Sequence, residues 1–236
     1  MSVKPIIFSG PMVRALLDGR KTQTRRVLNP QPPEWCANDT SPGYSVLCPR
    51  GHIEFRGRYI CVETGIDAGP SSKFIKLPYL KGDLLYVWEA WKPHSLFAHL
   101  KPREMPKSKV FYDADRRYAP SNTPWKPCIH MPRWASRLSL KVTDVRVQRL
   151  QDISREDAKA EGLKFHKTYG PNNIEAWCLE RPEDGVGHPE EVFAHLWQSL
   201  HTKAPKRWED NPWIVAVTFE VIKQNVDEYL AEREAA

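Results

Sequence analysis

Short segments with a clear hydrophobic period alternate along this chain with longer stretches rich in proline and glycine. Apolar residues recur at helical spacing in residues 10–19 and 189–200, so one face of each segment can be buried. Pro11 and Gly19 stand where a helix favours proline at its start and glycine after its end. We therefore predict one helix near the amino terminus and an amphipathic helix toward the carboxyl terminus.

Apolar or alternating segments of strand length predict a mainly β structure, in residues 59–63, 84–91, 109–113, 138–150 and 213–222. A polar strand that contains threonine is also expected, in residues 20–28. In residues 138–150 the apolar positions Leu138, Leu140 and Val142 share one phase, whereas Val145 and Val147 share the other. This change of phase predicts a β-bulge near Thr143 and Asp144.

Two more helices complete the expected set. Ser154 begins a variant of the capping box in a short helix that Gly162 closes, and residues 225–236 form a charged helix or a frayed tail. This order predicts a mixed α+β fold, mainly β, built as a small closed or nearly closed barrel with peripheral helices. The proline- and glycine-rich stretches are interpreted as long loop insertions into a single domain of residues 1–236.

Hydrophobic residues make up 41% of the chain and charged residues 27%, as in ordinary globular proteins. No apolar run approaches the roughly 18 residues of a membrane span, and the amino terminus lacks the apolar stretch of a signal peptide. Five scattered cysteines do not suggest a disulfide framework, so we expect a cytoplasmic protein. The net charge of +6 permits an anionic partner without requiring one.

The first candidate for chemistry is the basic segment of residues 19–26, which contains Lys21 and Thr24. A desolvated lysine can act as the base that a threonine nucleophile needs. The alternative is an exposed basic edge strand with threonine present for its β-propensity. In a regular strand Lys21 and Thr24 face opposite sides, so they meet only if the chain turns or bulges after Gly19.

Glu161 is the second candidate, because it lies at the end of the predicted helix, directly before Gly162. A carboxylate there opposes the helix dipole at a cost of about 0.3–1 kcal/mol, and residues that break a local rule often serve a function. The alternative is a solvated glutamate whose charge is screened.

A third group could bind a nucleobase, because bases stack on aromatic rings and arginine contacts phosphates and base edges. Its members are Trp88, Glu89, Trp91, His130, Arg133, Trp134 and Trp213. The alternative is that the tryptophans are core residues, which we favour for Trp88 and Trp213.

A fourth group resembles half of a zinc-binding knuckle, but the chain has no Cys-x-x-Cys pair to complete it. Metal binding by this group is left as an alternative, and we predict no cofactor. Its members are Cys36, Cys48, His52 and Cys61. Signatures of serine hydrolases and of phosphate-binding loops do not occur in the chain.

Residues 17–26, Leu-Asp-Gly-Arg-Lys-Thr-Gln-Thr-Arg-Arg, resemble the signature of ASCH-domain proteins, which have a PUA-like barrel. Residues 81–84, with Val87 and Glu89, and residues 142–145 fit the same pattern. Within this superfamily the chain resembles the bacterial N4-acetylcytidine amidohydrolases, and in its layout it resembles the larger ASCH proteins of phages and prophages.

The resemblance implies hydrolysis of the acyl amide on the exocyclic amine of cytidine, by a lysine, a threonine and a glutamate. The family's Gly-Arg-Lys-Thr-x-Thr motif places the first two roles on Lys21 and Thr24, and its Ala-x-x-Glu pattern places the third on Glu161. The expected partner is an N4-acylcytidine nucleoside or RNA. The residues that we expect to contact it are Arg20, Arg26, Trp88, Glu89, Arg133, Trp134 and Trp213.

The resemblance covers only part of the chain. It includes residues 12–26, 81–91, 139–163 and, weakly, 213–222. The segments without a counterpart in the amidohydrolases are the expected insertions, at about residues 29–78, 92–132 and 164–208.

In the hypothetical reaction Thr24 attacks the acyl carbonyl, releases cytidine and is freed from its ester by water. Either a neutral Lys21 is the base and a protonated Glu161 donates to the leaving amine, or a charged Lys21 stabilises the oxyanion and Glu161 is the base. Two other functions stay open. They are a nucleic-acid-binding module without chemistry and a metal-dependent ribonuclease.

Overall fold

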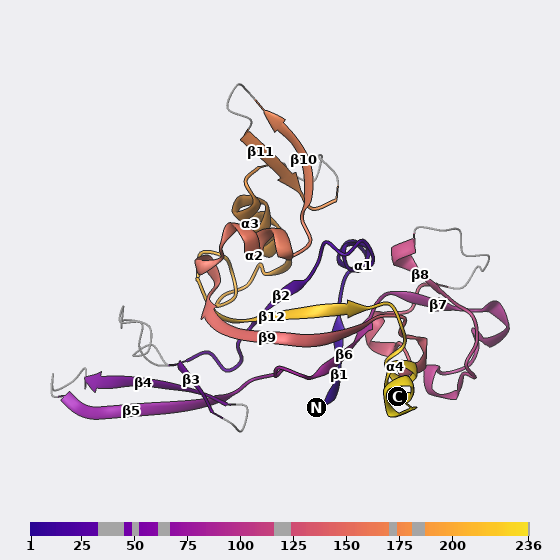
Figure 1. Ribbon diagram of the computed structural model, residues 1–236, viewed down its shortest axis with the longest axis horizontal. Helices are drawn as coiled ribbons and strands as arrows, with labels where there is room; N and C mark the ends of the chain where they lie inside the picture. Colours follow the sequence, from indigo (N-terminus) through magenta and orange to yellow (C-terminus); the bar gives the residue numbers. More distant parts are fainter. Residues whose placement is uncertain are drawn as a thin grey trace.

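The computed structural model describes residues 1–32, 45–48, 52–60, 67–115, 124–169, 174–180 and 187–235. These residues form a mixed α+β fold around one five-stranded sheet (Figure 1). In spatial order its strands are β1 (Val3–Ile7), β6 (Leu84–Trp88), β9 (Ser139–Arg149), β12 (Trp213–Ile222) and β2 (Gln23–Val27). Strands β1 and β6 are parallel, and all other neighbours are antiparallel.

Helices lie around this sheet, namely α1 (Gly10–Leu17), α2 (Arg155–Ala160), α3 (Pro189–Leu200) and α4 (Val226–Ala235). Short 3₁₀ turns occur at Ser95–Phe97, Pro102–Glu104, Asp113–Asp115, Cys128–His130, Arg133–Ala135 and Leu150–Asp152. Every helix in the described ranges is too short or too polar to serve as a membrane span.

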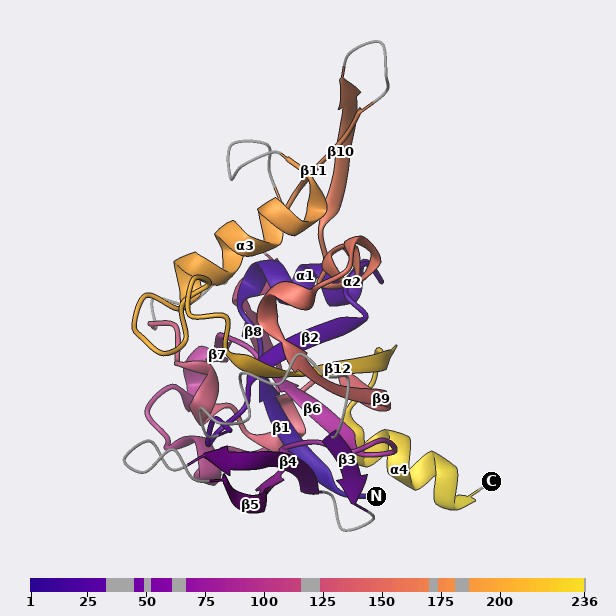
Figure 2. The same ribbon diagram turned by 90° about the vertical axis from the view of Figure 1, so that its left-hand side faces the viewer.

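Smaller antiparallel sheets lie almost entirely within the expected insertions at about residues 29–78, 92–132 and 164–208, and one of their strands coincides with the strand predicted at residues 109–113. Strands β3 (Ser45–Cys48), β4 (His52–Ile60) and β5 (Asp67–Lys76) form one, and β7 (Trp91–Pro93) and β8 (Val110–Tyr112) form another. Strands β10 (Lys164–Tyr169) and β11 (Ile174–Cys178) form a hairpin that extends away from the central sheet, next to α3 (Figures 1 and 2).

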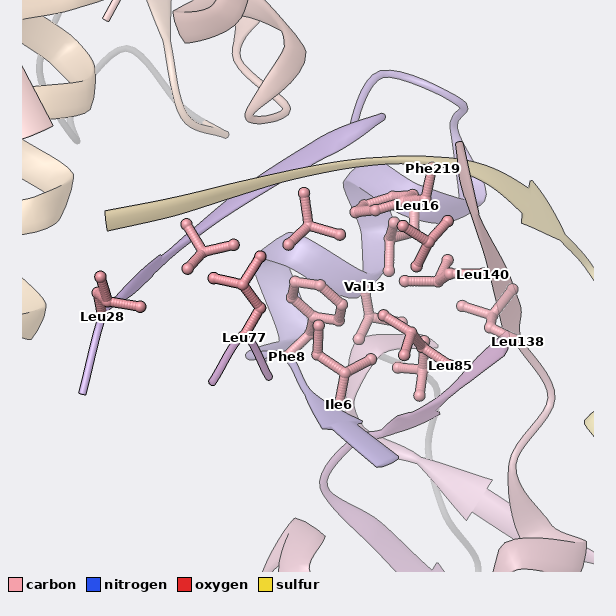
Figure 3. Close-up of a cluster of buried hydrophobic side chains, with 14 of the residues drawn as sticks. Ile6, Phe8, Val13, Leu16, Leu28, Leu77, Leu85, Leu138, Leu140 and Phe219 are labelled. Atoms are coloured by element: carbon pink, nitrogen blue, oxygen red, sulfur yellow. The ribbon is translucent and has the colours of Figure 1, made fainter. Parts of the chain in front are cut away.

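The main core lies where α1 packs against one face of the central sheet. Figure 3 shows Val13 and Leu16 of α1 beside Phe8, Leu85 and Leu140, and each of these residues is at most 2% exposed. Burying one such side chain stabilises the fold by about 1.5–3 kcal/mol. The helical spacing of apolar residues in α1 is therefore what fixes this helix over the sheet.

Several local predictions are confirmed. Helix α3 and strand β12 have the predicted bounds, and α1 ends just before Gly19. In the β9–β12 pair, Thr218 is opposite Asp144 while Phe219 is opposite Val142, so Thr143 is the extra residue of a bulge.

Other strands differ from their predicted ranges. Strand β2 begins only at Gln23, and the predicted strand at residues 59–63 meets the end of β4, with residues 61–63 outside the described part of the chain. The short strand β1 was not predicted, because Pro5 interrupts the apolar pattern of residues 3–7.

The mixed α+β class is confirmed, but the predicted closed barrel is not found. In the described residues no strand pairing joins the two outer strands, β1 and β2. They are linked instead by a side chain, because Nη2 of Arg26 on β2 donates to the carbonyl of Ile7 on β1 at 2.6 Å.

Candidate active site

The ends of α1 and α2 bring Lys21 and Glu161 together beside the start of β2. The chain leaves α1 through Gly19, whose φ of 74° is readily adopted by glycine. The amides of Arg20 and Lys21 then both donate to the carbonyl of Ala15, at 2.9 and 3.0 Å. Lys21 is thus held against α1, and it forms an isolated antiparallel bridge with Glu161, the residue that caps α2.

The side chains of this bridge form a buried ion pair. The Nζ of Lys21 donates to Oε2 of Glu161 at 2.7 Å and to the backbone oxygen of Glu161 at 2.9 Å. Lys21 is 0% exposed and Glu161 is 3% exposed. The ammonium group also lies 5.5 Å from the centre of the Phe8 ring. Because removing two charges from water is costly, such a pair is a candidate for chemistry.

A second cation, Arg25, contacts the other oxygen of the Glu161 carboxylate. Nη1 of Arg25 lies 3.3 Å from Oε1 of Glu161, and Nη2 donates to Oδ2 of Asp157 at 2.9 Å. The same Nη1 also donates to Oε1 of Gln23 at 2.6 Å. Glu161 therefore has a cation on each side, which offsets its unfavourable place at the carboxyl end of α2.

Thr24 lies on the side of the sheet that faces Phe8. It is opposite Val217 in the β2–β12 pair, and directly opposite residues share one face of a sheet. Val217 and Phe8 belong to the same buried cluster, and Thr24 is itself only 4% exposed. Because β2 begins at Gln23, Lys21 lies outside the strand and the opposite-face geometry of a regular strand does not apply. The Lys21 amine and the Thr24 side chain are thus both on the Phe8 side.

The electrostatics of the pair favour proton transfer at Lys21. Burial lowers the pKa of Lys21, and the charge and hydrogen bond of Glu161 oppose this effect only in part. A lysine with a lowered pKa loses its proton nearer to neutral pH, which a general base requires.

Two of the predicted substrate contacts lie near the ion pair. Arg20 donates to the carbonyl of Gly162, directly after the cap of α2. Arg26 lies two residues after Thr24 on β2, and its guanidinium carbon is 5.2 Å from the centre of the Phe8 ring. Arg26 therefore places a positive charge on the side of the sheet that carries Thr24.

The structure does not bring the other predicted contacts to this pair. Trp88 packs edge-on against Tyr86 at 5.9 Å, and its side chain belongs to a separate cluster with Trp134. Parity explains this placement, because Leu85 and Val87 of β6 take the core face and leave Trp88 on the opposite face.

Glu89, Arg133 and Trp213 also lie elsewhere. Both oxygens of Glu89 accept hydrogen bonds from Arg137, at 2.9 and 3.0 Å. The guanidinium of Arg133 lies 5.4 Å from the ring centre of Tyr86. Trp213 starts β12, opposite Arg149 and close to the end of β2 that lies away from Lys21. Their roles in substrate binding stay predictions.

Sequence reasoning missed three residues that organise the site. Gln23 and Arg25 lie on the face of β2 opposite Thr24, and both donate to Asp157. A signal existed for Asp157, because its amide donates to Oγ of Ser154 in the predicted capping motif. No local pattern distinguishes Arg25 from an exposed edge arginine, because its burial comes from α2 and α3.

No cluster of three or more histidine, cysteine or acidic residues suited to a metal occurs among the described residues. The side chains of Cys36, Cys48, His52 and Cys61 lie outside them.

No protein-family model, curated protein or solved structure matches the chain. The chemistry of the site therefore has to be inferred from its own geometry.

Proposed function

We propose that the protein is an amidohydrolase that cleaves the N4-acyl amide of N4-acylcytidines to cytidine and a carboxylic acid. The observation that carries the proposal is the fully buried Lys21–Glu161 pair, with its amine on the Thr24 side of the sheet. Burial lowers the pKa of this lysine, and a buried threonine lies on the same side of the sheet, which supports a base and a nucleophile at this site.

The reaction begins when Oγ of Thr24 attacks the acyl carbonyl while the neutral Nζ of Lys21 takes the hydroxyl proton. The tetrahedral intermediate then collapses, the bond from carbonyl carbon to N4 breaks, and the proton passes to the departing amine of cytidine. The acyl group is left as an ester on Thr24. Water hydrolyses this ester, with Lys21 again as the base, and releases the acid.

Glu161 holds the reacting amine in place in this mechanism. Its Oε2 and its backbone oxygen accept two hydrogen bonds from Nζ of Lys21, which orients the nitrogen lone pair when the third proton has left. Arg25 balances the carboxylate charge once Lys21 is neutral. The lowered pKa of Lys21 supports this version over one in which Lys21 stays charged and Glu161 is the base.

The proposal extends to the fold: a PUA-like barrel of the ASCH type, opened between β1 and β2. The hydrogen bond from Arg26 to Ile7 supports it, because it brings these two outer strands within one side-chain length. The order of the elements also supports it, since α1 leads directly into the segment that holds Lys21.

Release of cytidine from N4-acetylcytidine, followed by liquid chromatography, tests the activity. Thr24→Ala is expected to abolish turnover and Thr24→Ser to retain part of it. Thr22→Ala is the matched control, because Thr22 is exposed and lies two residues away. Full activity of Thr24→Ala would show that Thr24 is not the nucleophile. No turnover by the wild type would instead favour a nucleic-acid-binding module without chemistry.

A further inference from the structure

The hairpin β10–β11 has two unlike faces. Ala176 and Cys178 of β11 are 4% and 1% exposed, on the face that packs toward α3. On the other face Phe165 pairs directly with Trp177, and their rings meet edge to face at 5.5 Å. Phe165 is 46% exposed. A large ring left in water at the base of a projecting hairpin is not needed for packing, which indicates a binding surface.

Two cations of α2 adjoin this aromatic pair. The Nζ of Lys159, at the end of α2, lies 4.8 Å from the ring centre of Trp177. Arg155, at the start of α2, lies 3.8 Å from Glu175 beside Trp177, whereas Lys164 and Lys167 pair with Cys178 and Ala176 on the other face. Glu175 is the acidic exception, and Lys159 lies 3.5 Å from it. Aromatic rings among cations suit a ligand with flat bases and a negative backbone.

The hairpin also lies close to the proposed active site. Only Gly162 and Leu163 separate Glu161 from β10. Four residues of extended chain span at most about 14 Å, so Phe165 lies within that distance of Glu161. A nucleotide held at the Lys21–Glu161 pair would therefore have its neighbours in the polymer within reach of the hairpin.

We propose that the Phe165–Trp177 face of the hairpin binds single-stranded nucleic acid, so that the substrate is an acylated cytidine within a polynucleotide. The part about the substrate rests on the proposed function, whereas the binding surface does not. Bases adjacent to the reacting cytidine stack on Phe165, and Lys159 and Arg155 contact the phosphates.

Fluorescence anisotropy with short, labelled, unmodified oligonucleotides tests the surface, using single-stranded RNA, single-stranded DNA and a duplex. Phe165→Ala should weaken single-strand binding about 5- to 150-fold, the loss that corresponds to one base stacked on a ring. Phe165→Tyr should restore it. Lys159→Ala should reduce the slope of log affinity against log salt by about 1.

Leu200→Ala is the control, because Leu200 is 55% exposed and lies at the end of α3. Its affinity should match the wild type, and thermal unfolding should show that the Phe165 variants fold. The proposal is overturned if Phe165→Ala binds as tightly as the wild type, if the duplex binds as well as single strands, or if no oligonucleotide binds. Binding of RNA, DNA or both supports it, and their ratio shows whether the 2′-hydroxyl is read.

The oligonucleotides carry no acyl group, so the two proposals fail separately. Tight single-strand binding without turnover of N4-acetylcytidine would contradict only the proposed deacylation. Turnover of the free nucleoside without oligonucleotide binding would contradict only the proposed nucleic-acid surface.

Discussion

Among the buried carboxylates of the described residues, Glu161 pairs with Lys21 and Glu89 pairs with Arg137. Glu161 is 3% exposed and Glu89 is 1% exposed, so the two are removed from water to a similar degree. Glu89 receives two parallel hydrogen bonds from Arg137, which also pairs with Asp115 at 2.7 Å. Glu161 instead receives one hydrogen bond from the Lys21 side chain and a second cation from elsewhere in the fold.

The difference between the two pairs is the ability to release a proton. A guanidinium stays protonated at any physiological pH, so Arg137 can only hold Glu89 in place. Burial lowers the pKa of Lys21, and an amine can then act as a base. We therefore interpret the Glu89 pair as a structural link between β6 and the segment before β9, and the Glu161 pair as the reactive one.

Replacing Lys21 with methionine gives the largest expected effect. Lys21→Met keeps the length of the side chain but removes the base, so kcat/KM for N4-acetylcytidine should fall by about 10²–10⁴-fold. Arg25 still balances Glu161, so the variant should fold. Unchanged kinetics would show that the Lys21–Glu161 pair is structural, like the Glu89–Arg137 pair.

The matching change in the Glu89–Arg137 pair, Arg137→Met, should lower the free energy of unfolding. It leaves the Glu89 carboxylate buried without its cation, which costs about 3 kcal/mol of unfolding free energy. Urea unfolding of Arg137→Met and Lys21→Met side by side measures the contrast. A loss of turnover in Arg137→Met with unaltered stability would contradict our interpretation and place Arg137 in the chemistry.

Gly162→Ala tests how tightly the Lys21 backbone is held. Gly162 has a φ of 105°, and an added Cβ would lie 2.9 Å from Cβ of Ala15 and 3.0 Å from Cβ of Lys21. Strain and contact together should cost about 2 kcal/mol. Gly19→Ala is the control, because its φ is also positive but nothing lies within 4 Å of the added Cβ. Thermal unfolding should show a clearly smaller loss for Gly19→Ala, and equal losses would contradict the close packing.

The pH dependence of kcat/KM is the smallest of the expected effects. Lys21 must be neutral to act, so kcat/KM should rise about tenfold per pH unit up to its lowered pKa, which lies below the ordinary lysine value of about 10.4. The folded state then binds fewer protons at Lys21 than the unfolded state, so stability should rise with pH between these two values. A pH–rate profile measured together with urea unfolding checks both signs. A rate that falls as the pH rises over this range would show that Lys21 acts as a cation.

Local pattern was enough to predict α3, β12 and the bulge at Thr143, because periodicity along one segment determines which face can be buried. It also singled out Glu161, since a carboxylate at a helix end conflicts with the local dipole. The hairpin β10–β11 escaped prediction. Its strands are short, β10 is largely polar, and β11 is held by packing against α3.

The amino-acid sequence by itself determined the helices, the strands β9 and β12, and Lys21, Thr24 and Glu161 as the candidates for the proposed acyl transfer. Only the tertiary structure decided that the sheet stays open between β1 and β2, that Trp88 faces away from Thr24, and that Lys21 meets Glu161. The physical reason is that periodicity describes neighbours along the chain. Burial, ion pairing and the lowered pKa of Lys21 depend instead on elements that meet only after folding.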